Sequence, residues 1–383
     1  MSDSKSHSAK LLIAGGGTGG HVFPAIAVAR EWLRRAENAS VALQTREVVI
    51  VGTQKGLEAK LVPEAGLPLE TIRVAGLKGM RGIKFVRNAA LLAAGFWDSA
   101  ALLRRHRFAA AFGVGGYASG PMMLLAAATG VPTVLFEPNL EPGFTNRVLA
   151  RIAKRIATGF EETARRFGAK ARATGNPVRK EFFAAPVRDH RPPFTLLITG
   201  GSQGAQAINR AMIDSLDLLA EKKNQLFVVH QTGERDYNAV REAYARLNFN
   251  AEVSPFIGNM ADRFAQADLI ICRSGAITVA EIAAAGRAAI FIPFGAATDS
   301  HQLRNAQSFE QAGAARVIPQ NELTPKRLAS EIFSLLDLPA APGVAAAPGQ
   351  PGRIQDMEQR ARALARPRAV ADIVDMIEEV ARA

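Results

Sequence analysis

The sequence has few cysteines and no long hydrophobic runs. Its single cysteine, Cys272, in 383 residues excludes a disulfide framework and a metal site built from cysteines alone. No uncharged apolar stretch reaches the roughly 18 residues of a membrane-spanning helix, and the opening MSDSKSHSAK lacks the apolar core of a secretory signal. The hydrophobic and charged fractions, 48% and 21%, are those of a globular chain. We therefore expect a soluble protein of a reducing cytoplasm.

Acidic residues are also scarce relative to basic ones, 35 against 47, which gives a formal net charge of +12. Much of the excess lies in residues 73–107, where eight Lys and Arg residues accompany one acid, Asp98. Such a zone can attract nucleic acid, anionic lipid or a phosphorylated substrate. Interleaved apolar residues such as Trp97 favour a membrane surface, although Phe96 and its helical neighbours share one face that favours packing against the sheet. Nucleic-acid binding is not indicated, because the sequence lacks basic strands that also carry aromatic residues.

Short β-branched runs alternate with helical stretches, which is typical of parallel α/β units. Each half of the chain opens with an apolar strand, a glycine-rich turn and a helix; the turns are Gly15–Gly20 and Gly200–Ala205. The expected strands are Leu11–Ala14, Val48–Val51, Thr71–Val74, Ala109–Gly113 and Thr133–Phe136, then Thr195–Thr199, Leu226–His230, Val253–Ile257, Leu269–Cys272 and Ala289–Ile292. We predict an α/β protein of two doubly wound, Rossmann-like domains, with ligands bound at the carboxyl ends of the strands in a cleft between them.

Proline and glycine residues between positions 175 and 193 set the expected domain boundary. We assign residues 1–180 to the first domain and residues 181–383 to the second. Residues 339–352 are rich in Ala, Pro and Gly and predict a flexible loop. Residues 354–382 predict a C-terminal helix that Pro367 should kink or split.

The glycine-rich turns predict anion sites, because backbone N–H groups and a helix N-terminus would face a phosphate there. Neither turn ends in the Gly-Lys-Ser/Thr of a Walker A loop. The second expected strand ends Val51-Gly52-Thr53-Gln54-Lys55, without the acid that a dinucleotide site needs for its ribose. A tight turn without a ligand remains the alternative for either one.

Several polar residues follow the strands at positions suited to chemistry. His21 comes directly after the first turn, where it could take a proton from a hydroxyl or simply cap the helix. Glu281 lies one to two helical turns after Gly275, where a carboxylate could accept ribose hydroxyls or merely face solvent. Arg179 at the hinge could hold pyrophosphate, and residues 299–305 carry amide and imidazole groups that suit sugar hydroxyls.

Six segments occur in one order: GGGTGGHVFPA, GVGGYASGP, GNPVR, GGSQGA, CRSGAITVAEIAAAG and DxHQxxNA. Over about Lys10 to Gln320 the chain thereby resembles the MurG family of peptidoglycan N-acetylglucosaminyltransferases, in glycosyltransferase family 28. The resemblance implies a GT-B fold, no cofactor, and inverting transfer of N-acetylglucosamine from UDP-N-acetylglucosamine to the 4-hydroxyl of undecaprenyl-pyrophosphate-linked lipid I, giving lipid II and UDP. An enzyme that glycosylates diacylglycerol or another lipid is the alternative, and a non-enzymatic scaffold would require inert site residues.

The resemblance also assigns roles to particular residues. It places the acceptor on the N-terminal domain, with Tyr117 and Ser119 on that side, and the nucleotide sugar mostly on the C-terminal domain. His21 is the candidate catalytic base, and Glu137 is the next candidate. The implied donor-binding residues are Thr18, Gly19, Gly20, Asn139, Arg179, Ser202, Ile257, Ala276, Ile277, Thr278, Val279, Ala280, Glu281 and Gln302. Among these, backbone groups of Ile257 would read the uracil.

One segment departs from the family. Where the family usually reads His-Glu-Gln-Asn, this chain has Phe136-Glu137-Pro138-Asn139, so no role of that histidine or glutamine can be transferred. No Asp-x-Asp pair near a strand end would present a metal, so we expect none; backbone dipoles and Arg179 should hold the charge of the leaving UDP.

The basic zone gains a meaning from the resemblance. The expected contacts with an anionic membrane are Met80, Arg81, Ile83, Lys84 and Arg87, because apolar side chains can dip between headgroups that the basic residues attract. We therefore expect a peripheral protein on the cytoplasmic face of the bacterial inner membrane. Other cell-wall synthesis proteins are further candidate partners, and nucleic acid is not.

Overall fold

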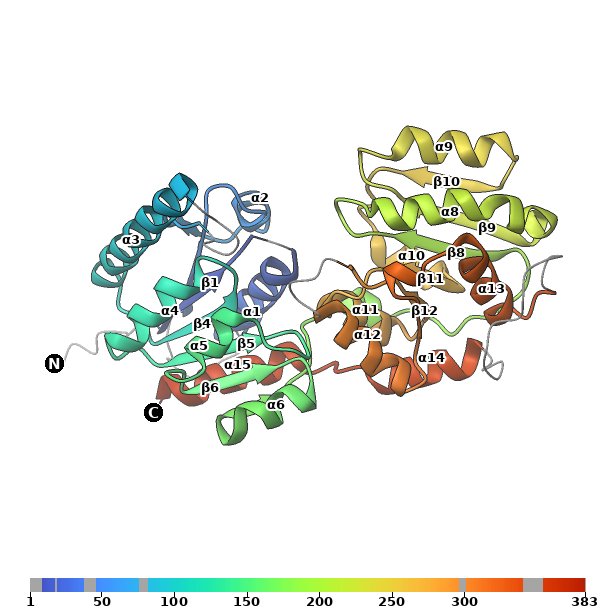
Figure 1. Cartoon of the computed structure of the whole chain (residues 1–383). Coiled ribbons are helices and arrows are strands. Elements are labelled where there is room, and N and C mark those ends of the chain that lie inside the picture. Colours follow the sequence, from blue (N-terminus) through green and yellow to red (C-terminus); the bar gives the residue numbers. More distant parts are fainter. Residues whose placement is uncertain are drawn as a thin grey trace. The chain divides into compact units, whose positions relative to one another are not determined.

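A computed structural model describes residues 9–17, 19–37, 46–75, 82–295, 301–339 and 354–382. The chain divides into two compact units, one of Met1–Val178 with Arg368–Ala383 and one of Arg179–Pro367. Each unit holds one parallel β-sheet flanked by helices (Figure 1). No helix within these ranges is long and apolar enough to cross a membrane.

The first unit is built on a parallel sheet with the strand order β3-β2-β1-β4-β5-β6-β7. The strands are β1 (Ala9–Gly15), β2 (Arg46–Gly52), β3 (Leu69–Thr71), β4 (Ala110–Gly115), β5 (Thr133–Glu137), β6 (Arg155–Thr158) and β7 (Ala171–Ala173). The helices are α1 (Gly19–Glu37), α2 (Glu58–Glu64), α3 (Gly82–Arg105), α4 (Ser119–Ala128), α5 (Phe144–Leu149), α6 (Glu161–Phe167), the 3-10 turn η1 (Gly168–Lys170) and α15 (Ala369–Arg382). Strand order reverses between β1 and β4, the position at which such sheets bind ligands.

Strand β1 explains why this sheet is covered on both faces. Leu11 and Ile13 are buried in a core shared with α1 and α15, whereas Leu12 and Ala14 are buried in a core shared with α4. A strand buried on both faces reads as a continuous apolar run, which is why its sequence predicted it clearly.

Helix α15 corrects the expected domain assignment, which placed all of residues 181–383 in the second domain. The helical region is split near Pro367, as predicted, into α14 (Ile354–Ala363) and α15. However, α15 buries Ile373 and Ile377 in the core of the first unit. Its Glu378 also accepts hydrogen bonds from Arg35 and Arg46.

The second unit has a parallel sheet with the strand order β10-β9-β8-β11-β12-β13. The strands are β8 (Phe194–Thr199), β9 (Leu226–Gln231), β10 (Ala251–Ser254), β11 (Leu269–Cys272), β12 (Ala288–Phe291) and β13 (Arg316–Val317). The helices are α7 (Lys180–Phe183), α8 (Gln206–Leu219), α9 (Tyr237–Arg246), α10 (Met260–Gln266), α11 (Ala276–Ala285), α12 (His301–Gln311), α13 (Pro325–Leu335) and α14, with 3-10 turns η2 (Ala220–Gln225) and η3 (Gln320–Glu322). The strand order repeats that of the first unit from β3 to β6, so the two glycine-rich turns follow equivalent strands, β1 and β8.

Two strands begin and end earlier in the sequence than predicted. The strand expected at Thr71–Val74 is β3, which ends at Thr71, and the one expected at Val253–Ile257 is β10, which ends at Ser254. The expected flexible loop 339–352 lies, apart from Pro339, outside the described residues.

Candidate functional site

In the first unit, His21 lies in the first turn of α1 and is half-buried. Its Nδ1 is 3.1 Å from the carbonyl oxygen of Gly16. Because a carbonyl only accepts, this bond assigns the proton of the neutral ring to Nδ1 and makes Nε2 the basic nitrogen. A Cβ atom on Gly115 would lie 3.0 Å from Nε2, so β4 approaches the ring closely with backbone alone. Burial lowers the pKa of His21, opposed by the Gly16 bond and the charge of Glu58. The ring is therefore suited to accept a proton near neutral pH.

A fully buried carboxylate holds the first glycine-rich turn, and the sequence analysis did not single it out. Glu58 Oε2 accepts a hydrogen bond from the backbone N–H of Gly17 at 2.7 Å. Its Oε1 accepts from the backbone N–H and Oγ1 of Thr53, at 2.8 and 2.7 Å. The Gly17 N–H is thus engaged within the protein, so one donor that we expected to face the leaving UDP is already used.

The acceptor-side motif divides into an exposed and a buried residue. Tyr117 is 60% exposed, whereas Ser119 is fully buried. The Ser119 hydroxyl donates to the carbonyl of Ala14 at 2.9 Å and accepts from the N–H of Gly115 at 3.3 Å. Ser119 therefore fastens the end of β4 to the end of β1 with its hydroxyl, whereas Tyr117 is the residue of this motif that is exposed.

Glu137 is likewise committed to its own loop. The residue is almost fully buried at the end of β5. Its Oε1 accepts from the backbone N–H and side-chain amide of Asn139, at 3.0 and 3.2 Å, and its Oε2 accepts from Gly143 N–H and the amide of Asn146, each at 2.9 Å. The carboxylate shapes the loop that presents Asn139, which is half-buried. The suggestion of Glu137 as second base stays a prediction.

The divergent Phe136 faces the core rather than a site. It is fully buried, and its ring centroid lies 6.3 Å from that of Phe112. The carbonyl of Pro138 accepts a hydrogen bond from the amide of Asn176 at 3.1 Å. The departure from the family pattern is therefore accommodated by apolar packing beneath Glu137.

In the second unit, a buried amide holds the second glycine-rich turn. Gln231 ends β9, and its Nε2 donates to Thr199 Oγ1 at 3.1 Å and to the carbonyl of Gly201 at 2.9 Å. Its Oε1 accepts the backbone N–H of Ile257 at 2.8 Å. That N–H is therefore engaged, and the carbonyl of Ile257 is the backbone group left for reading a base. Ser202 is exposed in the same turn.

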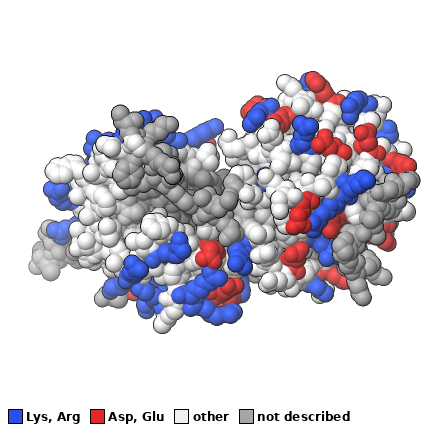
Figure 2. Space-filling view, in the orientation of Figure 1, with Lys and Arg blue, Asp and Glu red and all other residues white. Residues whose placement is uncertain are grey.

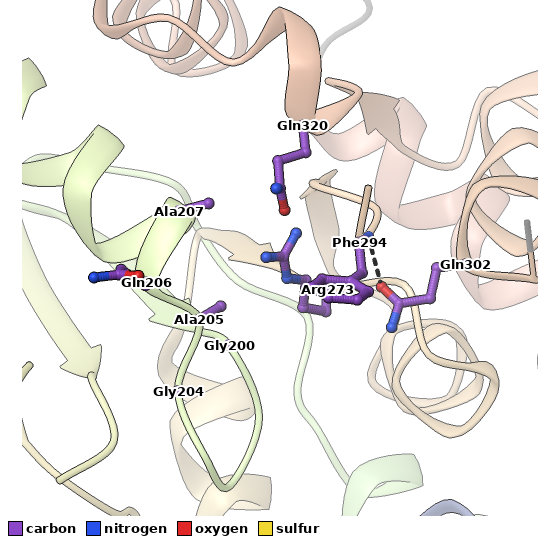
Figure 3. Close-up of a pocket in the computed structure, with 9 residues that line it drawn as sticks. All are labelled: Gly200, Gly204, Ala205, Gln206, Ala207, Arg273, Phe294, Gln302 and Gln320. Atoms are coloured by element: carbon purple, nitrogen blue, oxygen red, sulfur yellow. Dashed lines mark hydrogen bonds between the residues drawn. The ribbon is translucent and has the colours of Figure 1, made fainter. Parts of the chain in front are cut away.

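A cavity of about 390 Å³ opens beside this turn. Figure 3 shows the guanidinium of Arg273 and the amide of Gln320 directed toward each other within it. Arg273 donates to the carbonyl of Ile292 at 2.9 Å and stacks on Phe294 at 5.3 Å. The described lining residues include this cation and no carboxylate: Gly200, Gly204, Ala205, Gln206, Ala207, Arg273, Phe294, Gln302 and Gln320. The cavity therefore suits an anionic ligand.

Gln302 is the one predicted donor-binding side chain that lines this cavity. Its Oε1 accepts from the backbone N–H of Phe294 at 2.9 Å (Figure 3). The amide nitrogen of Gln302 is therefore the atom that can donate to a ligand. The Oε1 atom of Gln320 is buried without a hydrogen-bond partner among the described residues. Sequence reasoning missed Arg273 and Gln320 as cavity residues.

Glu281 and Arg179 form a second group in this unit. Glu281 is half-buried on α11, and burial raises its pKa to about 7, against the opposing charge of Arg179. Arg179 is exposed, and its guanidinium carbon lies 5.0 Å from the ring centroid of Phe182. Neither residue lines the cavity. A desolvated carboxylate of this kind gains from hydrogen-bond donors such as ribose hydroxyls.

The start of α11 supplies the other predicted donor contacts. Gly275 is its N-cap in an extended conformation, and Ala276 is its first residue. Ile277, Thr278 and Ala280 are half-buried, whereas the side chain of Val279 is buried. Any contact that Val279 makes with a ligand must therefore come from its backbone.

Some predicted residues lie outside the described parts of the chain. These are Thr18, Met80 and Arg81, together with the side chains of Ile83 and Lys84. Gly19 and Gly20 are the half-buried first residues of α1, and Arg87 is exposed on α3.

Two Rossmann-like sheets in tandem, each with a glycine-rich turn after its first strand, define the GT-B class of glycosyltransferases. The family model described as the glycosyltransferase family 28 N-terminal domain matches residues 11–158, and that of the family 28 C-terminal domain matches residues 195–347. The chain therefore belongs to glycosyltransferase family 28.

Known proteins resemble the chain over nearly its whole length. A protein of Myxococcus xanthus (strain DK1622) is 41% identical over 96% of this chain and 92% of its own; one of Geotalea uraniireducens (strain Rf4) is 42% identical over 96% and 97%. Both are named UDP-N-acetylglucosamine--N-acetylmuramyl-(pentapeptide) pyrophosphoryl-undecaprenol N-acetylglucosamine transferase. The crystal structure of Acinetobacter baumannii MurG has a TM-score of 0.75 and 30% identity, and covers 97% of this chain and 99% of that one.

Proposed function

We propose that this protein transfers N-acetylglucosamine from UDP-N-acetylglucosamine to the 4-hydroxyl of the N-acetylmuramoyl-pentapeptide of lipid I, yielding lipid II and UDP. The observation that carries the proposal is the similarity of about 41–42% along almost the full length of relatives named for this reaction. The site chemistry is compatible with it, because one unit offers a neutral base and the other a cationic cavity.

The reaction is a single displacement with inversion. The acceptor oxygen attacks the anomeric carbon while the bond from that carbon to the diphosphate breaks, and its electron pair leaves with UDP. The hydroxyl proton passes to Nε2 of His21, whose Nδ1 is fixed on Gly16. A neutral imidazole is the form able to take this proton.

The donor is assigned to the second unit. Its glycine-rich turn is held by the uncharged amide of Gln231, whereas the first is held by the carboxylate of Glu58, and an anionic diphosphate favours the uncharged environment. Arg273 in the cavity and the N-terminus of α11 would hold the diphosphate. Glu281 would accept the ribose hydroxyls, while Ser202, Arg179 and Gln302 would contact the phosphates or the sugar.

The acceptor and membrane are assigned to the first unit, where the described surface has exposed apolar and basic residues. Phe144 is 72% exposed, and Val148 and Ile152 follow it at intervals of four residues. Arg147 and Arg151 accompany this stripe, and residues 144–155 contain no acid. Figure 2 shows Lys and Arg side chains gathered over α5 and α6.

Helix α3 carries another exposed aromatic residue, Trp97, which lies under the guanidinium of Arg104 at 5.9 Å. Such a combination suits an anionic lipid surface. Peripheral attachment at the cytoplasmic face of the inner membrane, with Tyr117 near the acceptor, follows from this assignment. Other cell-wall synthesis proteins are further partners within the proposal.

The test is incubation with labelled UDP-N-acetylglucosamine and a water-soluble lipid I analogue. We expect a disaccharide product and one UDP per product, and much less of both with His21→Gln at unchanged UDP affinity. Diacylglycerol in a parallel reaction tests the alternative lipid acceptor. Transfer to diacylglycerol but not to the lipid I analogue would overturn the proposal.

A further inference from the structure

A single peptide group in the first glycine-rich turn is held from both sides. The carbonyl oxygen of Gly16 lies 3.1 Å from Nδ1 of His21. The N–H of Gly17, which belongs to the same peptide group, donates to Oε2 of Glu58 at 2.7 Å. We propose that Glu58 is a positioning residue that orients His21 and increases the basicity of its Nε2 through this shared peptide group. The importance of this for catalysis rests on the proposed function, in which His21 is the base.

The surroundings of Glu58 are shaped to hold a carboxylate. A Cβ atom on Gly16, Gly52 or Gly56 would lie 2.3, 2.4 or 2.0 Å from atoms of the Glu58 side chain. Three glycines from two separate turns therefore leave the space that the side chain fills. Thr53 donates to the other oxygen through both N–H and Oγ1, so each oxygen of the fully buried carboxylate has a donor.

These donors keep the carboxylate charged. Burial alone would raise the pKa of Glu58, but the hydrogen bonds from Gly17 and Thr53 outweigh it and lower that pKa. An uncharged side chain at this position would not need three hydrogen-bond donors around its oxygens. The turn of the second unit is held by an uncharged amide instead: Gln231, at the end of β9, holds the turn after β8. The first turn is therefore distinguished by its negative charge.

The charge reaches His21 in two ways. A carboxylate that accepts the Gly17 N–H polarises the peptide group, which makes the Gly16 carbonyl a stronger acceptor for Nδ1–H. It also attracts a positive ring directly, and the charge of Glu58 raises the pKa of His21 against the effect of burial. On the Nε2 side, β4 brings the backbone of Gly115 close to the ring.

The decisive variant is Glu58→Gln, which keeps the shape and one acceptor oxygen but removes the charge. Thr53→Val is the matched control, because it removes a hydrogen bond to the same carboxylate and retains the charge. The readout is the pKa of the His21 ring in the full chain, followed by NMR of labelled histidine and assigned with His21→Gln. We expect Glu58→Gln to lower this pKa by roughly 0.5 to 1 unit, less than the 1–3 units of a directly paired charge. Thr53→Val should leave it within about 0.2 unit.

Kinetics provide the second readout. In Glu58→Gln the acid limb of the pH–rate profile should move to lower pH by the same amount, with a several-fold lower kcat and little change in the KM for UDP-N-acetylglucosamine. A role confined to bracing the turn would leave the His21 pKa and the acid limb unmoved, and that result would overturn the inference.

The parent protein offers an independent test if Glu58→Gln does not fold. Above its pKa, the ring of His21 should show the nitrogen shifts of the Nδ1–H tautomer, and the Nε2–H tautomer would contradict the inference. These measurements need no turnover. If the pKa moves as expected but His21→Gln retains parental activity, then Glu58 does act on His21 through the shared peptide group. In that case it is the assignment of His21 as base that fails.

Discussion

A histidine with a buried side chain, near the amino-terminal ends of β8 and β11, should make stability depend on pH. The side chain of His190 is 3% exposed, with Nδ1 2.8 Å from Asp268 Oδ1 and Nε2 3.1 Å from Glu358 Oε2. Burial alone would lower the pKa of His190, but the hydrogen bonds and charges of the two carboxylates outweigh it and raise the pKa to about 9. The perturbation to test is His190→Gln, which keeps hydrogen-bonding capacity and removes the charge.

The magnitude follows from the shift in pKa from 6.5 to about 9. At about 1.4 kcal/mol per unit, a shift of about 2.5 units corresponds to about 3 kcal/mol of stabilisation. Because the folded pKa is the higher one, this stabilisation is fully present below pH 6.5. It is lost as the pH rises from 6.5 through about 9.

The assay is the free energy of unfolding of the second unit at pH 6 and pH 9.5, for parent and variant. Both tryptophans, Trp32 and Trp97, lie in the first unit, so hydrogen exchange of peptides from β8 and β11 is a better probe than fluorescence. The free energy of unfolding of the parent should exceed that of His190→Gln at pH 6. We expect this difference to shrink by about 3 kcal/mol when the pH is raised to 9.5.

His230 provides the matched control. Burial lowers its pKa to about 3, and its ring bonds neutral partners, Tyr244 and Asn209. Its contribution is therefore present above pH 6.5 and lost as the pH falls below it. His230→Gln should keep the parental pH dependence between pH 7 and 9.5. An unchanged pH dependence in His190→Gln would refute the reasoning.

Three further predictions concern ligands. Glu281→Ala should weaken UDP binding by about 1.5–3 kcal/mol, with the deficit shrinking below pH 7 as the parental carboxylate protonates; equal affinities by calorimetry would rule out the ribose contact. Turnover should survive EDTA, because Arg273 and the N-terminus of α11 would hold the charge of the leaving diphosphate; loss reversed by one specific divalent ion would show otherwise. Arg147→Glu with Arg151→Glu should release the protein from anionic vesicles while sparing use of a soluble acceptor, and undiminished vesicle binding would argue against that surface.

The sequence predicted the strands whose apolar runs are continuous and β-branched. Strands β1, β2, β8 and β11 are of this kind, because both faces of each are covered. Strands β6, β7 and β13 were missed because they are only two to four residues long and each contains an arginine. Their strand conformation comes from pairing with longer neighbours.

The candidate site was predictable where a residue follows a motif along the chain. The predictions for His21, Gln302 and Glu281 were made in this way. Glu58 was not, because in sequence it is an ordinary glutamate at the start of a short helix, and its burial depends on glycines from two turns that meet only in the fold. Gln231 was missed for a similar reason: its partners lie 26 to 32 residues away.

Sequence proximity to a motif does not show which way a side chain faces. Ser119 lies two residues after an exposed tyrosine in the acceptor-side segment, and its hydroxyl faces the ends of β1 and β4. Whether a residue beside a glycine-rich turn faces a ligand or the sheet depends on how the following helix starts, which the motif does not specify.

The position of α15 has a consequence for how the chain is made. During translation, residues 1–178 leave the ribosome without Ile373, Val374 and Ile377, which belong to the core of that unit. Domains usually fold as units in the order of their synthesis, but here the first unit must wait until the second has been produced. Until then the apolar face that α15 covers remains open to chaperones or to aggregation. A truncation after α14 would therefore remove part of the core of the first unit, although the truncated residues follow the second unit in sequence. The sheet of the second unit would remain complete.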